Sequence, residues 1–460
     1  MTTYEKCVTF AAETLEKARV NCSPKPLIGE GLDRFWVETA DARDVHSSFR
    51  DNLAIVLQEE GTPRVLVHGH RGCGKSTEIN KFLSQLGSEW LVVALRADDF
   101  LPPSGNEAAD VLLAACTRLM DVVAEQKLSL NEDLLKPVLA FFAETTAVQT
   151  DERSSELQAE AGADVSTGVL GKLLGLKAKL VASLKFGSRT EQSTIHRVRR
   201  RKGELCAAVN ALTIAAEKAW QAKKGNPAAK LLLVIEELDK LGLADARQIF
   251  VLDGRILSEV AVRAIYTIPV FTFHSADAGA IRSHFEHDLA LPMIKVCQPD
   301  GKPCAEGRDT LNHLVRERVT PSVLPEDALS LLIERTGGVL RDIFEAIQTA
   351  AQFRTVRSEG IISRAAIDLA LERMVTTLGL QIAYPPEDRK DPKILQEKLA
   401  EIARAQAGGQ TKRAQPDPDL QLLLMSGALL EYNGTGWLGV HPLARKYLQD
   451  LGYDVGAISP

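Results

Sequence analysis

Apolar residues along the chain follow two spacings, one typical of buried strands and one typical of amphipathic helices. Short runs rich in aliphatic and β-branched residues predict strands at 64–69, 91–95, 231–235 and 264–273. Between the first two strands, residues 75–86 carry apolar side chains at helical spacing. Strands separated by helices in this way indicate an α/β fold with a parallel sheet.

The remaining pattern is largely helical and divides the chain into four parts. We expect a helical lead-in at 1–60, a core at 61–300 with a helical insertion at about 145–205, a helical lid at 301–380 and a winged-helix-like module at 381–460. The last part is predicted from helical patterns on both sides of Asn433-Gly434, a strong hairpin signal.

A glycine-rich segment joins the first predicted strand to the helix that follows it. Its sequence, GHRGCGKS, satisfies the phosphate-loop pattern GxxxxGK[S/T] in the strand-to-helix context that the pattern requires. Backbone N–H groups, the helix N-terminus and the Lys75 ammonium would bind the phosphates of ATP, and Ser76 would bind Mg²⁺. The residues expected to contact the nucleotide are Gly69, Arg71, Gly72, Cys73, Gly74, Lys75, Ser76 and Thr77.

Two acids, Glu236 and Glu237, stand at the end of the third predicted strand. An acid at such a position serves the water shell of Mg²⁺, and a second carboxylate can polarise the attacking water. We assign the metal to Glu236, together with Ser76, and the water to Glu237. Asp239 is the alternative for either role.

The two motifs together, GHRGCGKST and LLLVIEELDK, resemble those of the AAA+ and STAND branches of P-loop ATPases. The similarity covers roughly residues 50 to 376, about the length of a core with its lid, and implies an ATPase fold with a helical lid. The chain departs from the family pattern in two ways. Position 236 holds Glu where Asp is more usual, and the stretch between Lys75 and Glu236 is longer than a minimal core needs.

The resemblance implies three further site residues. The polar sensor at the end of the next strand corresponds to Thr267, with Thr272 as the alternative. Arg341, in the sequence GGVLRD, corresponds to the lid arginine that contacts the nucleotide. Arg282 corresponds to the arginine finger that acts on a neighbouring subunit.

Composition narrows the class of protein. With 460 residues, 45% of them hydrophobic, the chain is long enough for several domains. Its seven cysteines are scattered and form no CxxC pair, which favours neither a disulfide framework nor a zinc site. No uncharged apolar run approaches the roughly 18 residues of a membrane span. We therefore expect a cytoplasmic protein without integral membrane contact.

The formal charge of −6 argues against a surface built as a whole to bind nucleic acid. Two local features remain as candidates, an amphipathic Leu/Lys stretch at 169–185 and a basic run at 197–202. Packing on the core is the favoured interpretation of the first, and a solvated face that of the second. Duplex DNA is a candidate partner that is not favoured, because basic residues in 381–460 are matched by acids.

Three functions follow from these patterns. The first is an ATP-driven switch in which nucleotide orders the lid, an oligomer completes the site, and hydrolysis moves the C-terminal module. The second is a signalling scaffold that holds ATP with little turnover and recruits an effector protein, with antiviral defence as a setting by analogy alone. The third is a DNA-loading ATPase that uses the winged helix.

Overall fold

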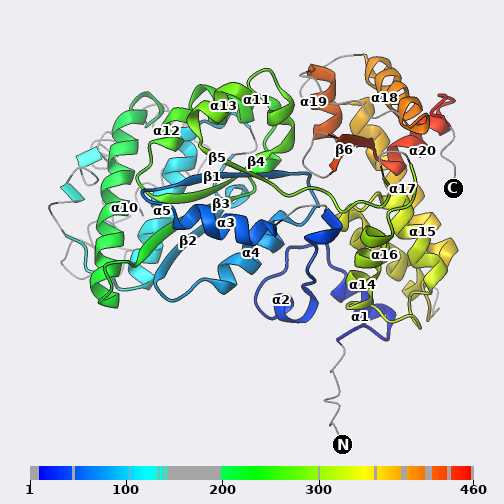
Figure 1. Ribbon diagram of the computed structural model, residues 1–460, viewed down its shortest axis with the longest axis horizontal. Helices are drawn as coiled ribbons and strands as arrows, with labels where there is room; N and C mark the ends of the chain where they lie inside the picture. The colour runs from blue at the N-terminus through cyan, green and yellow to red at the C-terminus, as the bar shows by residue number, and fades with distance from the viewer. Residues whose placement is uncertain are drawn as a thin grey trace, which may run out of the picture.

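The computed structural model describes residues 10–43, 47–102, 104–131, 133, 135–136, 138, 140–141, 198–298, 301–356, 360–384, 391–409, 417–432 and 437–456. Most of the expected insertion, including the Leu/Lys stretch, lies outside these residues, and so does the Asn433-Gly434 turn. Figure 1 shows a sheet flanked by helices in one half of the molecule and a mostly helical body in the other. The two halves are joined along the carboxyl ends of the strands.

The sheet has five parallel strands in the order β2-β3-β4-β1-β5. Their bounds are β1 Arg64–Gly69, β2 Trp90–Arg96, β3 Lys230–Glu236, β4 Arg263–Pro269 and β5 His287–Ala290. This sheet confirms the predicted α/β fold class. Two details differ from prediction: β4 ends at Pro269 rather than at 273, and β5 was not predicted at all.

Side chains that alternate along the strands separate the two faces of the sheet. Val65 and Val67 pack with α3 (Phe49–Gln58) and α4 (Lys75–Gln85) on one face. Leu66 lies in the core of the other face. The helices that the sheet domain contributes to that second core are α5 Ala108–Glu125, α10 Lys202–Lys224, α11 Leu243–Arg247, α12 Gly254–Ser258 and α13 Ala278–His284.

Four helices follow the sheet and form the lid, which the sequence predicted as a helical region. They are α14 Ala305–Arg316, α15 Glu326–Thr336, α16 Leu340–Val356 and α17 Arg364–Ala383. They share a core with α1 (Leu15–Asn21) from the start of the chain. Ala12 also forms a parallel bridge with Val319, so the N-terminal segment is attached to the lid as well as to the sheet domain that follows it.

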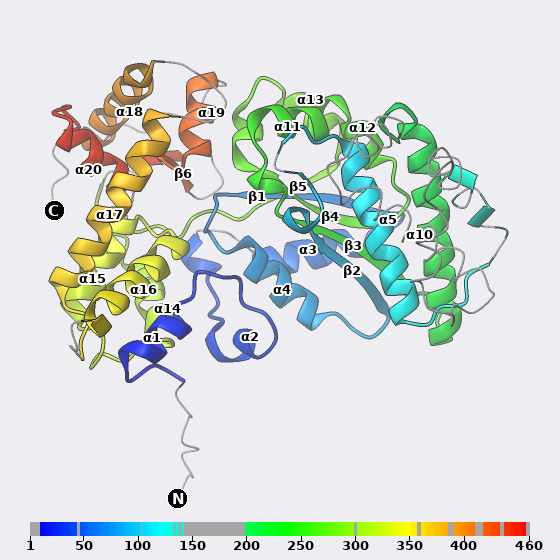
Figure 2. The ribbon, with the colours of Figure 1, turned by 180° about the vertical axis from the view of Figure 1, so that it is seen from behind.

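The C-terminal module contains α18 Pro392–Ala407, α19 Pro418–Met425, β6 Leu429–Tyr432, β7 Trp437–Val440 and α20 Pro442–Asp450. Strands β6 and β7 pair in antiparallel register, which confirms the expected hairpin and the winged-helix-like arrangement. Figure 2 shows this module beside α17, with α19 and β6 on the side nearest the sheet domain. Among the helices that the structure describes, none is long and apolar enough to cross a membrane.

Candidate functional site

The phosphate loop turns at glycines whose backbone conformation other residues rarely adopt. Gly72 and Gly74 have φ angles of 86° and 105°, in the left-handed region that favours glycine. A methyl group added at Gly72 would lie 2.8 Å from Cβ of Arg341, so only glycine allows the lid to approach this closely. The loop is therefore shaped both for inward-facing N–H groups and for contact with the lid.

Lys75 begins α4 and is buried beneath the loop. Its Nζ donates to the carbonyls of Gly69 (2.8 Å) and His70 (2.9 Å) and forms an ion pair with Asp239 at 2.8 Å. Burial raises the pKa of Asp239, but the Lys75 ammonium outweighs this effect and holds that pKa below its ordinary value. Asp239 is thus the internal counter-ion of Lys75.

Glu236 lies at the end of β3 and is followed by Glu237, which lines the same cavity as Ser76. The phosphate loop and the acidic strand end therefore lie at one place in the structure. Burial, together with the charges of Asp239 and Glu237, raises the pKa of Glu236 to about 7, although the Ser76 hydrogen bond lowers it. Within the described part of the chain, Oε2 of Glu236 is buried and has no hydrogen-bond partner.

Glu237 adopts a backbone conformation that is unusual for a side chain of its size, with a φ angle of 69°. Its Oε1 accepts from Arg96 and forms an ion pair with Lys240 at 3.0 Å. Its Oε2 is buried without a hydrogen-bond partner among the described residues. Arg96 and Lys240 therefore fix one carboxylate oxygen, and the other is left without a partner in the part of the chain that is described.

We expect the Glu236→Gln variant to be more stable than the wild type at alkaline pH. The pKa of this carboxyl is raised from 4.5 to about 7 on folding. The free energy of unfolding of the protein therefore falls as pH rises between these values. Glutamine imitates the protonated carboxyl and does not ionise. The melting temperature of the variant should therefore exceed that of the wild type by about 2 °C or more at pH 8. At pH 5 the difference should be small, and thermal melts at both pH values measure it.

An exposed glutamate on α18 provides the control for this comparison. At each of the two pH values, Glu397→Gln should have the same melting temperature as the wild type, because the Glu397 side chain is exposed to solvent. Equal melting temperatures of wild type and Glu236→Gln at pH 8 would mean that ionised Glu236 is well solvated in the folded protein.

The structure distinguishes the two sensor threonines. Thr267 lies in β4 beside Val67 of β1, and its hydroxyl is buried with no partner among the residues described. Tyr266, the residue before it, pairs with Ile235 of β3, so Thr267 lies one position further along, level with Glu236. Thr272 lies beyond the strand in the turn η6 (Val270–His274) and donates to the carbonyl of Pro269 at 2.6 Å. Of the two threonines, Thr267 is therefore the one whose hydroxyl has no partner within the described part of the chain.

The two predicted arginines lie in different places. Arg341 joins the lid to the phosphate loop, because its backbone N–H donates to the carbonyl of Gly72 at 3.3 Å. Arg282 of α13 forms an ion pair with Asp288 at 3.6 Å and lies over the ring of Phe273. It lines neither of the two cavities beside the loop, so within one chain it is not part of this site.

Several predicted loop residues face away from the glutamates. Gly69 and Arg71 line a cavity of about 530 Å³ on the lid and C-terminal side of the loop, and Arg71 donates to the carbonyl of Lys240. The Cys73 side chain is buried in the core. Gly72, Gly74, Lys75, Ser76 and Thr77 line a cavity of about 260 Å³ that also contains Glu237.

The N-terminal segment forms one wall of this smaller cavity, which the sequence did not predict. Helix α2 (Glu30–Phe35) is flanked by non-helical residues, so 1–60 is not a continuous helical lead-in. Leu27 donates its N–H to the hydroxyl of Thr77 at 3.2 Å and accepts from Asn80. Phe35 and Phe344 add apolar surface on the lid side.

Arg43, another residue absent from the sequence prediction, supports the loop from behind. It is buried and donates to the hydroxyl of Thr39 and to the carbonyls of Cys73 (2.8 Å) and Pro292. Burial lowers the pKa of Arg43, with the charges around Cys73 and Glu78 opposing the effect. Arg43 thus connects the N-terminal segment and the phosphate loop with the linker between β5 and α14, which contains Pro292.

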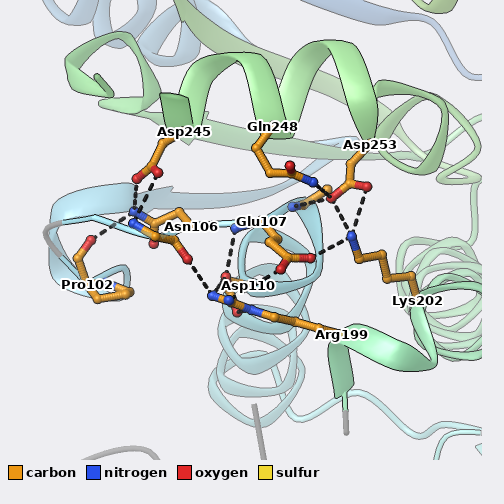
Figure 3. A network of polar contacts seen from close by, with 11 residues as sticks. Pro102, Asn106, Glu107, Asp110, Arg199, Lys202, Asp245, Gln248 and Asp253 are labelled. Atoms are coloured by element: carbon orange, nitrogen blue, oxygen red, sulfur yellow. Dashed lines mark hydrogen bonds and ion pairs between the residues drawn. The ribbon is translucent and has the colours of Figure 1, made fainter. Parts of the chain in front are cut away.

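The basic run at 197–202 is largely neutralised where it is described. Arg199 pairs with Asp110 at 2.6 Å and with Glu107 at 3.3 Å, and Lys202 pairs with Asp253 at 2.7 Å. Figure 3 shows this network between the start of α5, the start of α10 and the segment that includes Gln248. These cations hold the base of the expected insertion on the core and do not form a free basic face.

The oxygen atoms that converge here suit Mg²⁺ and a triphosphate. Magnesium takes hard oxygen ligands and usually keeps several waters and phosphate oxygens. Ser76 and Glu236 would supply protein oxygens, and the partnerless Oε2 of Glu236 fits a ligand of this kind. Lys75, the loop amides and the start of α4 supply positive potential for the phosphates.

Comparisons with known proteins found no matching family model and no matching curated protein. Similar solved structures include a Walker-type ATPase of Pyrococcus abyssi, at 11% identity and a TM-score of 0.45, covering 93% of this chain and 99% of that one. They also include the Aeropyrum pernix Orc1 protein in complex with DNA, at 12% identity and 0.39, covering 95% and 97%. The Aeropyrum pernix Orc2 protein, solved in ADPNP–ADP complexes, matches at 12% and 0.38, covering 88% and 91%. At these scores the assignment of the P-loop fold rests on the sheet, the loop and the paired acids of the chain itself.

Proposed function

We propose that this chain is a Mg²⁺-dependent ATPase that works as a nucleotide-controlled switch of AAA+ type. The observation that carries the proposal is the small cavity that Lys75 and Ser76 of the phosphate loop line together with Glu237 of the acidic strand end. Gly72, Gly74 and Asp239 also line it, so loop backbone, the Lys75 ammonium and the carboxylates of Glu237 and Asp239 surround one space. This is the set of groups that phosphoryl transfer to water requires.

The roles of the residues follow from their positions. Mg²⁺, when bound, would neutralise charge on the β and γ phosphates, and Ser76 with Glu236 would hold it. The free Oε2 of Glu237 would accept a proton from the attacking water while Arg96 and Lys240 fix the other oxygen. The Thr267 hydroxyl would orient that water or a γ-phosphate oxygen.

The lid is the part that would move. Arg341 contacts the loop at Gly72, so a change of charge at the γ-phosphate would alter the position of α16. The apolar surface of Phe35 and Phe344 would face the base of the nucleotide. An oligomer, with Arg282 acting on the neighbouring subunit, is the assembly that would complete the site.

The test is binding and turnover of ATP by the full chain. We expect a fluorescent ATP analogue to bind, phosphate to be released from ATP, and release to stop when EDTA removes Mg²⁺. A chain that binds no nucleotide at millimolar concentration would refute the proposal. Light scattering with and without a slowly hydrolysed analogue would report the change in subunit number.

Turnover also separates this proposal from the two alternatives. Tight binding with negligible phosphate release would favour a scaffold that holds ATP and recruits an effector. Hydrolysis that is stimulated by duplex DNA, with a steep dependence on salt, would favour a DNA-loading ATPase. The ion pairs of Arg199 and Lys202 speak against the basic run as the DNA contact.

A further inference from the structure

The C-terminal module contacts the phosphate loop directly. The backbone N–H of Glu431, in β6, donates to Nε2 of His70 at 2.6 Å. His70 is the second residue of the loop, and both side chains are buried. Figure 1 shows β6 beside the carboxyl end of β1, where the loop begins. A residue of the phosphate loop is therefore hydrogen-bonded to the C-terminal module.

The His70 ring is fixed in one protonation state. Because Nε2 accepts a hydrogen bond, the proton of the neutral ring lies on Nδ1. Burial is the main cause that lowers the pKa of His70 to about 3, so the ring stays neutral at physiological pH. The carbonyl of the same residue accepts from Lys75 at 2.9 Å. His70 thus connects the C-terminal strand to the lysine of the loop.

Four further contacts hold β6 and the start of α20 against the core and lid. The Glu431 carboxylate lies 3.3 Å from Nε2 of His274. The backbone carbonyl of Glu431 accepts from the N–H of Met293 at 3.3 Å. The Tyr432 hydroxyl donates to the carbonyl of Gly337 at 2.9 Å, and His441 lies 3.0 Å from Asp342. The last two contacts flank the segment that delivers Arg341 to the loop.

We infer that His70 is a positioning residue and that docking of β6 against it is thermodynamically coupled to nucleotide binding. The inference rests on the proposed ATPase function. A docked strand holds the loop in one conformation, so less conformational entropy is lost when a nucleotide binds. Coupling of this kind is reciprocal, so a nucleotide must hold β6 in place to the same degree.

Two substitutions at His70 and one control test this inference. His70→Leu removes the acceptor, whereas His70→Gln places an amide oxygen near the position of Nε2. His313→Leu changes an exposed histidine of α14 and serves as the control. We expect affinity for a slowly hydrolysed fluorescent ATP analogue to fall about five-fold or more in His70→Leu. The other two variants should bind like the wild type.

Hydrogen exchange of the wild-type chain gives a readout that needs no variant. Saturating analogue with Mg²⁺ should slow exchange of the amides in the peptide that contains β6, and His70→Leu should reduce this protection. Unchanged exchange of that peptide, or an affinity of His70→Leu equal to or tighter than that of the wild type, would overturn the inference and leave the proposed ATPase intact. A wild-type chain that binds no analogue would overturn both.

Discussion

Replacement of Lys75 by alanine is expected to abolish ATP binding at concentrations that saturate the wild type. Loss of one partner of a buried charge pair costs about 2–5 kcal/mol, which is roughly a thirty-fold or greater loss of affinity. The buried ammonium is also the only lysine among the loop residues that line the smaller cavity. Titration of a fluorescent ATP analogue measures the effect, and wild-type affinity in the variant would contradict the assigned role.

The same substitution should also destabilise the fold, because it leaves Asp239 buried without its counter-ion. The double variant Lys75→Ala/Asp239→Asn removes that unpaired charge. It should recover most of the thermal stability but none of the ATP binding. Lys81→Ala, on the same helix and with its ammonium over the ring of Trp36, is the control that should keep both. This set separates a loss of binding from a loss of folding.

Replacement of Glu237 by glutamine is expected to stop hydrolysis while ATP still binds. Glutamine keeps the volume and one oxygen that can accept from Arg96, but it cannot take a proton from water. General-base catalysis typically contributes a factor of about 10²–10⁴, so phosphate release should fall by about a hundred-fold or more. A single-turnover assay with radiolabelled ATP measures this rate independently of product release.

Two outcomes would contradict this assignment. Unchanged turnover in Glu237→Gln would remove Glu237 as the base. A comparable loss of ATP affinity would show that its carboxylate acts in binding rather than in the chemical step. Glu397→Gln, at an exposed position of α18, is the control and should hydrolyse ATP like the wild type.

Local sequence patterns predict the centre of the candidate site because its chemistry is concentrated in short segments. The loop from Gly69 to Ser76 and the acids after β3 each carry their geometry in neighbouring residues. Their meeting at one edge follows from parallel pairing alone. The extent of β4 was overestimated, because residues 270–273 are apolar and aromatic like a strand. Pro269 cannot donate to a ladder, and the chain turns there.

The supporting residues could not be found in this way because their contacts are distant in sequence. Arg43 binds the carbonyl of Pro292, which lies 249 positions away, and no pattern around a single arginine indicates such a contact. The His70 and Glu431 pair is separated by 361 positions. Strand β5 has only four residues, all partly exposed and of mixed polarity, so its spacing carries no strand signal.

The bridge between Ala12 and Val319 limits how the lid can move. The chain runs between the sheet domain and the lid at two places, once through the linker that contains Pro292 and once through the N-terminal segment that is anchored at Thr77. A movement of the lid away from the sheet must therefore carry the N-terminal segment with it, or break either the Ala12 bridge or the contacts of Leu27 with α4. Lid opening is thus restrained on the N-terminal side as well as at the linker.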